Sequence, residues 1–355
     1  MTRYDYKSLS PQDFEELTRD ILQAEWNVPI EAFKAGRDQG IDLRYAPLHG
    51  GLTIVQCKHY ASSSFSNLLY DLKNSELPKV RRLRPHRYVI VTSLPLSPSD
   101  KDKIVNALSP FVLTTADVLG ADDLNGLLSR HPAIEQSNFK LWLTSSSVLA
   151  RVIHNAEICQ AEFEVERIRA KLPVFVQNNS FNRAQDLLNE QRILIISGVP
   201  GIGKTTLAEM LLYAHLDDGY QPVVLQTDVS EGKKLFRPKE KQVFYYDDFL
   251  GQTFLGDQRS YVSRNHDAAI ISFMEMVRET SHSKFILTTR EHILRQAFQV
   301  SERFMRSTLT AHHCVLELED YSFGQRARIL HNHLYFSDLQ QVYKNVVLQD
   351  HFFLE

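Results

Sequence analysis

The chain has 355 residues, enough for about two domains of ordinary size. With 43% hydrophobic and 23% charged residues it has the composition of a core-forming protein. A formal net charge of -3 excludes a polycation, so any contact with nucleic acid has to come from a local basic surface. Three cysteines without a CxxC pair, no N-terminal apolar segment and no apolar run of about 18 residues predict a cytoplasmic protein without a disulfide framework, signal peptide or membrane span.

The first part of the chain predicts a compact α/β domain over residues 1–144. Ser10 as N-cap and Pro11 in the first turn begin a helix that runs to about Trp26. Alternating apolar residues and Gly/Pro turn chemistry then predict a hairpin, followed by helix, strand and helix. These later elements are expected over residues 41–46, 52–58, 65–77, 88–92 and 99–108.

The predicted hairpin gathers side chains suited to the hydrolysis of a phosphodiester. Side chains alternate along a strand, so Gln56 and Lys58 point to one side while Cys57 faces the core. Asp42 begins the partner strand, which brings a carboxylate near the amide and the ammonium group. In this hypothesis Asp42 ligates Mg²⁺, Gln56 supplies an oxygen ligand, and Lys58 positions or activates water.

One negative charge is missing from that ligand set, because position 56 is Gln rather than Glu. A carboxylate of the first helix, Glu15 or Glu16, is expected to restore it as a metal ligand. Two other interpretations stay open: an amphipathic hairpin with a solvated lysine, and a nuclease-like domain that has lost its activity. The basic segment 79–87 either contacts DNA phosphates or is a solvated helix end.

Residues 145–172 contain no Gly and no Pro and predict a polar helical connector. Beyond it, strands and helices alternate over residues 173–355, which predicts a parallel sheet with helices on both faces. The strands are expected over 193–197, 223–226, 243–246, 285–288 and 314–318, and the main helices over 204–216 and 268–280.

The first strand of this second domain runs into a glycine-rich loop and then a helix, which is the context that a P-loop requires. Glycines let backbone N–H groups approach phosphates at a helix N-terminus. Lys204 is expected to reach the β- and γ-phosphates, Thr205 to ligate Mg²⁺, and Thr206 to contact the α-phosphate side. The whole predicted phosphate loop consists of Gly198, Val199, Pro200, Gly201, Ile202, Gly203, Lys204, Thr205 and Thr206.

Two further strand ends carry charged residues that suit the same site. Asp247 is expected to hold the Mg²⁺ shell and Asp248 to orient or deprotonate the attacking water. Arg290 follows another strand, where it senses the γ-phosphate, stabilises transition-state charge or is an ordinary surface residue. Because no guanine-reading Asn-Lys-x-Asp tetrapeptide occurs, the sequence favours ATP over GTP.

The P-loop, the Asp247-Asp248 strand end and Thr288-Thr-Arg290 together resemble a STAND-type signal-transducing NTPase, over roughly residues 172–336. The later segment 321–334 resembles the helical region that follows such a core. STAND proteins usually continue into a winged-helix region and sensor repeats, whereas this chain stops at Glu355. A fragment or an unusually short member is therefore expected.

The N-terminal motifs Phe14-Glu15-Glu-Leu17, Gly40-Ile-Asp42 and Gln56-Cys-Lys58 resemble an Mrr-like restriction endonuclease of the PD-(D/E)xK superfamily, within roughly residues 8–120. In that family Gln is a familiar variant at the acidic position two before the Lys, so Gln56 does not imply inactivity. The family's pattern implies Glu15 rather than Glu16 as the helix carboxylate.

The fusion of the two domains resembles bacterial antiviral STAND proteins of the AVAST type with Mrr-like effectors. The resemblance implies ATP-driven homo-oligomers, with a tetramer among the possibilities, that cut double-stranded DNA with Mg²⁺. It also implies a phage protein as trigger, sensed by regions outside this chain. Two alternatives remain: an ATP-dependent restriction enzyme acting on modified DNA, and a signalling ATPase whose N-terminal domain only binds nucleic acid or a partner.

Overall fold

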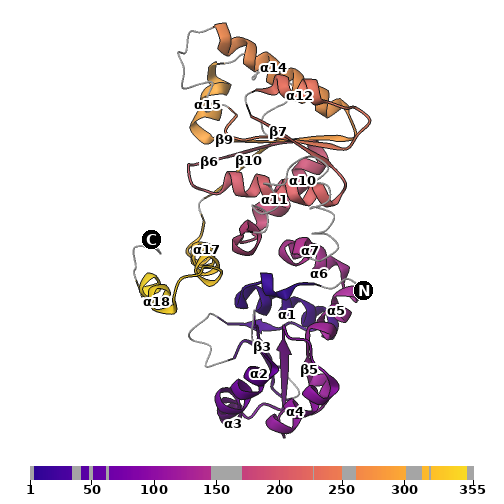
Figure 1. Ribbon diagram of the computed structural model, residues 1–355, viewed down its shortest axis with the longest axis vertical. Coiled ribbons are helices and arrows are strands. Elements are labelled where there is room, and N and C mark those ends of the chain that lie inside the picture. Colours follow the sequence, from indigo (N-terminus) through magenta and orange to yellow (C-terminus); the bar gives the residue numbers. More distant parts are fainter. Residues whose placement is uncertain are drawn as a thin grey trace. The chain divides into compact units, whose positions relative to one another are not determined.

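A computed structural model describes residues 4–33, 41–47, 51–60, 64–144, 170–226, 228–249, 261–300, 314–319 and 321–349. The chain divides into two compact units, Met1–Val148 and Leu149–Glu355, and each has a sheet of its own (Figure 1). Most of the predicted connector, residues 145–169, lies outside the described ranges. Within those ranges no helix has the length and apolar character that a membrane crossing needs.

The N-terminal unit contains a mixed five-stranded sheet in the order β1-β2-β3-β4-β5. The first three strands are antiparallel, and β3, β4 and β5 are parallel. The hairpin expected from the sequence is present as β2 and β3, with Leu43 opposite Val55. The strands are β1 (Glu31–Ala32), β2 (Leu43–Tyr45), β3 (Thr53–Lys58), β4 (Arg87–Thr92) and β5 (Val118–Leu119).

Helices cover both faces of this sheet. Alternate side chains of β3 therefore pack into two separate hydrophobic cores, one on each face. Val55 and Cys57 pack with Phe14 and Leu17 of α1 (Pro11–Trp26), whose first turn is closed by a capping box between Ser10 and Asp13. Ile54 packs with side chains of α2 (Phe65–Asp71), α3 (Leu77–Leu83) and α4 (Pro98–Leu108) on the other face. The remaining helices are α5 (Ala121–Arg130), α6 (Pro132–Ser137) and α7 (Phe139–Thr144).

The helical segment after β3 is less regular than its sequence predicts. A single helix was expected over 65–77, but a π-helical turn, Leu72–Glu76, lies between α2 and α3. Leu72 and Leu68 keep the apolar contact with the sheet through this turn. Glu76 is the last residue of this turn and is buried.

The C-terminal unit contains a parallel five-stranded sheet in the order β10-β6-β9-β8-β7, as the alternating pattern predicts. Helices α10 and α11 lie on one face, and α12, α14 and α15 on the other (Figure 1). The strands are β6 (Ile193–Gly198), β7 (Gln221–Leu225), β8 (Gln242–Tyr246), β9 (Ser283–Arg290) and β10 (Val315–Glu317). The helices are α10 (Asn179–Gln191), α11 (Lys204–Asp217), α12 (Val229–Leu235), α14 (Tyr261–Glu279), α15 (Glu291–Val300), α17 (Phe323–Tyr335) and α18 (Gln341–Gln349).

A buried lysine–histidine contact joins β9 to α11 near the start of β9. The Lys284 ammonium lies 2.7 Å from His215 Nε2, and His215 Nδ1 lies 2.8 Å from the Leu211 carbonyl oxygen. An ammonium group only donates and a carbonyl only accepts, so the ring is neutral with its proton on Nδ1. Burial, followed by the Lys284 charge, lowers the pKa of His215 to about 4.

Candidate nuclease centre and nucleotide site

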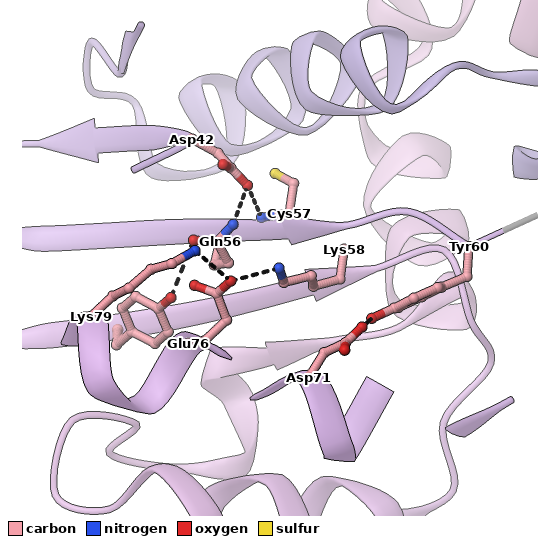
Figure 2. Close-up of polar contacts among 9 residues, drawn as sticks. Asp42, Gln56, Cys57, Lys58, Tyr60, Asp71, Glu76 and Lys79 are labelled. Carbon is pink, nitrogen blue, oxygen red and sulfur yellow. Dashed lines mark hydrogen bonds and ion pairs between the residues drawn. The ribbon is translucent and has the colours of Figure 1, made fainter. Parts of the chain in front are cut away.

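Asp42 and Gln56 meet beside the hairpin of the N-terminal unit (Figure 2). Asp42 Oδ2 accepts hydrogen bonds from Gln56 Nε2 at 2.6 Å and from the Cys57 backbone N–H at 2.8 Å. Burial raises the pKa of Asp42 to about 6 and outweighs these two bonds and the nearby Lys58 charge. The structure thus places the carboxylate and the amide of the predicted metal site in direct contact.

The amide of Gln56 is oriented by a second partner. The Tyr88 hydroxyl donates to Gln56 Oε1 at 3.2 Å, and both side chains are buried. The Tyr88 hydroxyl donates to the amide oxygen, and the Asp42 carboxylate accepts from the amide nitrogen. Both contacts therefore agree with the same orientation of the Gln56 amide. Tyr88 carried no recognisable motif in the sequence.

Lys58 lies on the same face of β3 as Gln56 and pairs with an acid that the sequence did not single out. Its ammonium group lies 2.8 Å from Glu76 Oε1, and Lys79 lies 3.0 Å from the same oxygen (Figure 2). The Glu76 side chain is only 2% exposed. Glu76 belongs to the π-helical turn, which no residue pattern predicts, so its place in this centre could not be found from the sequence.

Glu15 lies on α1, the helix that covers the opposite face of the sheet from Lys58 and Glu76. Its charge adds to burial and to the Asp42 charge in raising the pKa of the Cys57 thiol well above its usual value. The structure therefore brings Asp42, Gln56 and Lys58 together and leaves Glu15 as a sequence-based candidate. Gly40 lies outside the described residues, and within these no group of three or more His, Cys, Asp or Glu is arranged for a metal ion.

The phosphate loop of the C-terminal unit turns tightly between β6 and α11. Gly201 and Gly203 have φ values of 83° and 93°, in the left-handed region that favours glycine. A Cβ on Gly203 would also lie 2.9 Å from the Tyr321 hydroxyl. Val199 and Pro200 are exposed in the loop, whereas Ile202 is buried.

Lys204 begins α11 and folds back over the loop. Its ammonium group donates to the carbonyl oxygens of Gly198 at 3.1 Å and Val199 at 2.9 Å. Burial is the main cause that lowers the pKa of Lys204, partly offset by the Asp248 charge. These carbonyl contacts hold the ammonium group at the mouth of the loop.

The acids expected at the β8 end lie beside this loop. Asp247 accepts a hydrogen bond from Thr205 Oγ1 at 3.1 Å and another from the Thr288 hydroxyl. Thr288 Oγ1 also accepts the Asp248 backbone N–H at 2.9 Å, which fixes Asp248 at a left-handed φ of 46°. Thr288 therefore positions both acids, a role that the sequence did not reveal.

Arg290 lies at the end of β9 and pairs with Asp248, with 3.3 Å between Nη2 and Oδ2. All the charged residues predicted for the nucleotide site thus lie at one sheet edge. A cavity of about 300 Å³ adjoins this edge. Its lining includes Val176, Asn178, Gly203, Thr206, Leu207 and Tyr321.

Two family models match separate parts of the chain. Residues 6–84 match the Restriction endonuclease model of the Mrr catalytic domain, and residues 175–336 match Novel STAND NTPase 3. The chain joins an Mrr-type restriction-endonuclease domain to a STAND NTPase domain. Both resemblances drawn from the motifs are confirmed.

One curated relative matches part of the chain, the uncharacterized protein y4cD of Sinorhizobium fredii (strain NBRC 101917 / NGR234). It is 40% identical over 171 residues, which are 48% of this chain and 26% of the relative. The chain therefore matches about a quarter of that protein's length.

Similar solved structures include a closed-state reconstruction of Hsp104 with ATPγS and FITC casein and the structure of C. elegans PCH-2. The first is 18% identical, with a TM-score of 0.30, and covers 48% of this chain and 29% of that chain. The second is 14% identical, with a TM-score of 0.25, and covers 53% and 50%. At these scores the likeness adds nothing to the strand order described above.

Proposed function

We propose that this chain is an ATP-regulated, Mg²⁺-dependent endonuclease that cuts double-stranded DNA as the effector of a bacterial anti-phage response. The observation that carries the proposal is the contact of Asp42 with Gln56 beside Lys58, within an Mrr-type domain. The assembled edge around Lys204 and Asp247 in the STAND domain supplies the regulatory half.

In the nuclease centre, Asp42 and Gln56 are the residues that would hold a divalent ion. Such an ion lowers the pKa of bound water and offsets charge on the scissile phosphate. Asp42, with a pKa of about 6, is largely ionised at neutral pH and so able to bind a cation. Lys58, two residues after Gln56 on the same strand face, is placed to orient water and to stabilise negative charge on the phosphate. Glu15 of α1 is the carboxylate that the family pattern adds to this set.

In the nucleotide site, Lys204 would exchange its two backbone carbonyl partners for the β- and γ-phosphates. Thr205 and Asp247 already share a hydrogen bond and would hold Mg²⁺ together. The pair Asp248–Arg290 would separate, so that Arg290 contacts the γ-phosphate and Asp248 orients water. The adjoining cavity has a size suited to a nucleoside, and Thr206 lines it beside the loop.

ATP binding would act as the switch and slow hydrolysis as the reset. The nucleotide-bound chain would assemble into a homo-oligomer, with a tetramer as one possibility, after a phage protein is sensed by regions outside this chain. Assembly would bring several nuclease domains onto one DNA duplex. The exposed Arg81, Arg82 and Arg84 around the end of α3 would contribute phosphate contacts.

The test is cleavage of plasmid DNA by the purified chain, with and without ATP, Mg²⁺ and phage lysate. The proposal expects double-strand cuts that need all three additions and that disappear in Lys58→Ala. Cutting of methylated plasmid alone, without lysate, would instead favour a modification-dependent restriction enzyme. DNA binding without any Mg²⁺-dependent cutting would favour a signalling ATPase that only binds DNA.

A further inference from the structure

Glu76 is a buried carboxylate whose two oxygens differ in their hydrogen-bond partners among the described residues. Its Oε1 forms ion pairs with the ammonium groups of Lys58 at 2.8 Å and Lys79 at 3.0 Å. Its Oε2 is buried and has no hydrogen-bond partner within the described part of the chain. A buried oxygen of a charged group is costly when it is left without a partner, and the Tyr88 hydroxyl that adjoins Glu76 donates to Gln56, so Oε2 is able to accept a ligand.

The surroundings of that oxygen indicate what the ligand is. Asp42 is close enough for the Glu76 charge to raise the pKa of its carboxyl group, and Gln56 lies between them in contact with Asp42. Among the described residues, Asp42 uses only Oδ2 for its two hydrogen bonds, which leaves Oδ1 for a ligand. The carboxylates of Asp42 and Glu76, together with Gln56 Oε1, which accepts from the Tyr88 hydroxyl, are oxygen donors of the kind that a hard divalent cation prefers.

The lysine partners do not compete for this oxygen. Both ammonium groups contact Oε1, and they compensate the charge of a side chain that would otherwise be buried unpaired. A cation at Oε2 would leave both ion pairs in place. The π-helical turn supports the same interpretation, because irregular turns of this kind occur frequently at functional sites.

We propose that Glu76 is a further acidic ligand of the divalent cation in the nuclease centre. It supplies from the α2–α3 face the negative charge that Gln56 lacks. This inference rests on the proposed nuclease function and names a ligand that the hairpin motif does not contain.

The experiment measures Mn²⁺ binding to the full chain by isothermal titration calorimetry, without nucleotide or DNA, together with Mn²⁺-dependent plasmid cleavage. The variant Asp42→Asn identifies the heat that belongs to the nuclease centre. Glu76→Gln is expected to weaken Mn²⁺ binding there by at least ~10-fold, since one charged ligand is lost. Asp71→Asn is expected to stay within about twofold. Asp71 is the matched control, because it lies on α2 and is engaged with the Tyr60 hydroxyl.

Unchanged Mn²⁺ affinity in Glu76→Gln would overturn the inference. If Glu76→Gln does not fold, Glu76→Asp keeps the charge but withdraws the oxygens by one methylene. That variant is expected to melt near the wild-type temperature and to bind Mn²⁺ several-fold more weakly, and wild-type affinity in it would also overturn the inference. A wild-type chain that binds Mn²⁺ through Glu76 but never cuts DNA would support the ligand assignment and sink the nuclease function.

Discussion

The two sites of this chain are built in opposite ways. The nucleotide site is a continuous loop with acids at neighbouring strand ends, and its Arg290 and Asp248 side chains are about 39% and 42% exposed. The nuclease centre collects buried groups from separate elements, with Glu76 only 2% exposed. An exposed pair is separated by a ligand at little cost, whereas a buried pair keeps its geometry. The nucleotide site is therefore suited to rearrangement, and the nuclease centre to fixed positioning.

The largest effect is expected from Lys58→Ala, which removes a charged group from the nuclease centre. Loss of the ammonium group removes charge stabilisation from the phosphate and leaves Glu76 with Lys79 alone. Plasmid cleavage should fall by about 1000-fold, at the upper end of the effect of removing one pre-organised donor. ATP binding, measured by fluorescence with a labelled analogue, should be unchanged. Cleavage at the wild-type rate would exclude this active site.

Lys204→Ala should have the next largest effect, and it tests the nucleotide site. Two charge-assisted contacts to phosphates are lost, so ATP affinity should fall by about 100-fold. Cleavage that depends on ATP should disappear with it, while DNA binding in a mobility-shift assay should persist. Full nuclease activity in this variant would mean that the two domains work independently.

A third prediction concerns His215, a buried residue of the STAND domain away from the nucleotide site, whose ionisation is controlled mainly by burial. The pKa of His215 is lowered from 6.5 to about 4, so its stabilising neutral form is complete above pH 6.5 and lost as the pH falls toward 4. Between pH 7 and pH 4.5 wild type should lose about 2 kcal/mol relative to His215→Gln. Urea unfolding of both proteins at the two pH values measures this difference. Parallel pH dependences would show that the ring is not held neutral against Lys284.

The smallest effect is expected from Tyr88→Phe, which probes how firmly the nuclease centre is positioned. The variant removes the hydroxyl that orients Gln56, a neutral hydrogen bond of about 1 kcal/mol. Cleavage should fall by about fivefold with no change in ATP binding. Tyr60→Phe is the matched control, because that hydroxyl contacts Asp71, and it should cut within about twofold of wild type. An equal loss in both variants would argue against a specific role for Tyr88.

Most residues of the two sites could be predicted from the sequence, for a different reason at each site. The P-loop, the β8 acids and Arg290 were predictable because a parallel sheet brings strand ends to one edge, and local residue order is enough to place them. The hairpin residues Asp42, Gln56 and Lys58 were predictable from strand alternation and turn chemistry.

The residues that the sequence missed all act across elements. Glu76 depends on a π-helical turn, Tyr88 reaches Gln56 from the neighbouring strand β4, and Thr288 links two acids through its hydroxyl. Their contacts are set by packing between segments far apart in the chain, and neither composition nor periodicity records them.

The most direct test of coupling between the two sites compares two curves on nucleotide-stripped wild-type protein with Mg²⁺ and phage lysate. One curve is ATP occupancy, and the other is the rate of plasmid cleavage, both as functions of ATP concentration. The account predicts no cutting without ATP and the same half-maximal concentration for both curves. Cleavage at the full rate before any ATP is added would contradict it.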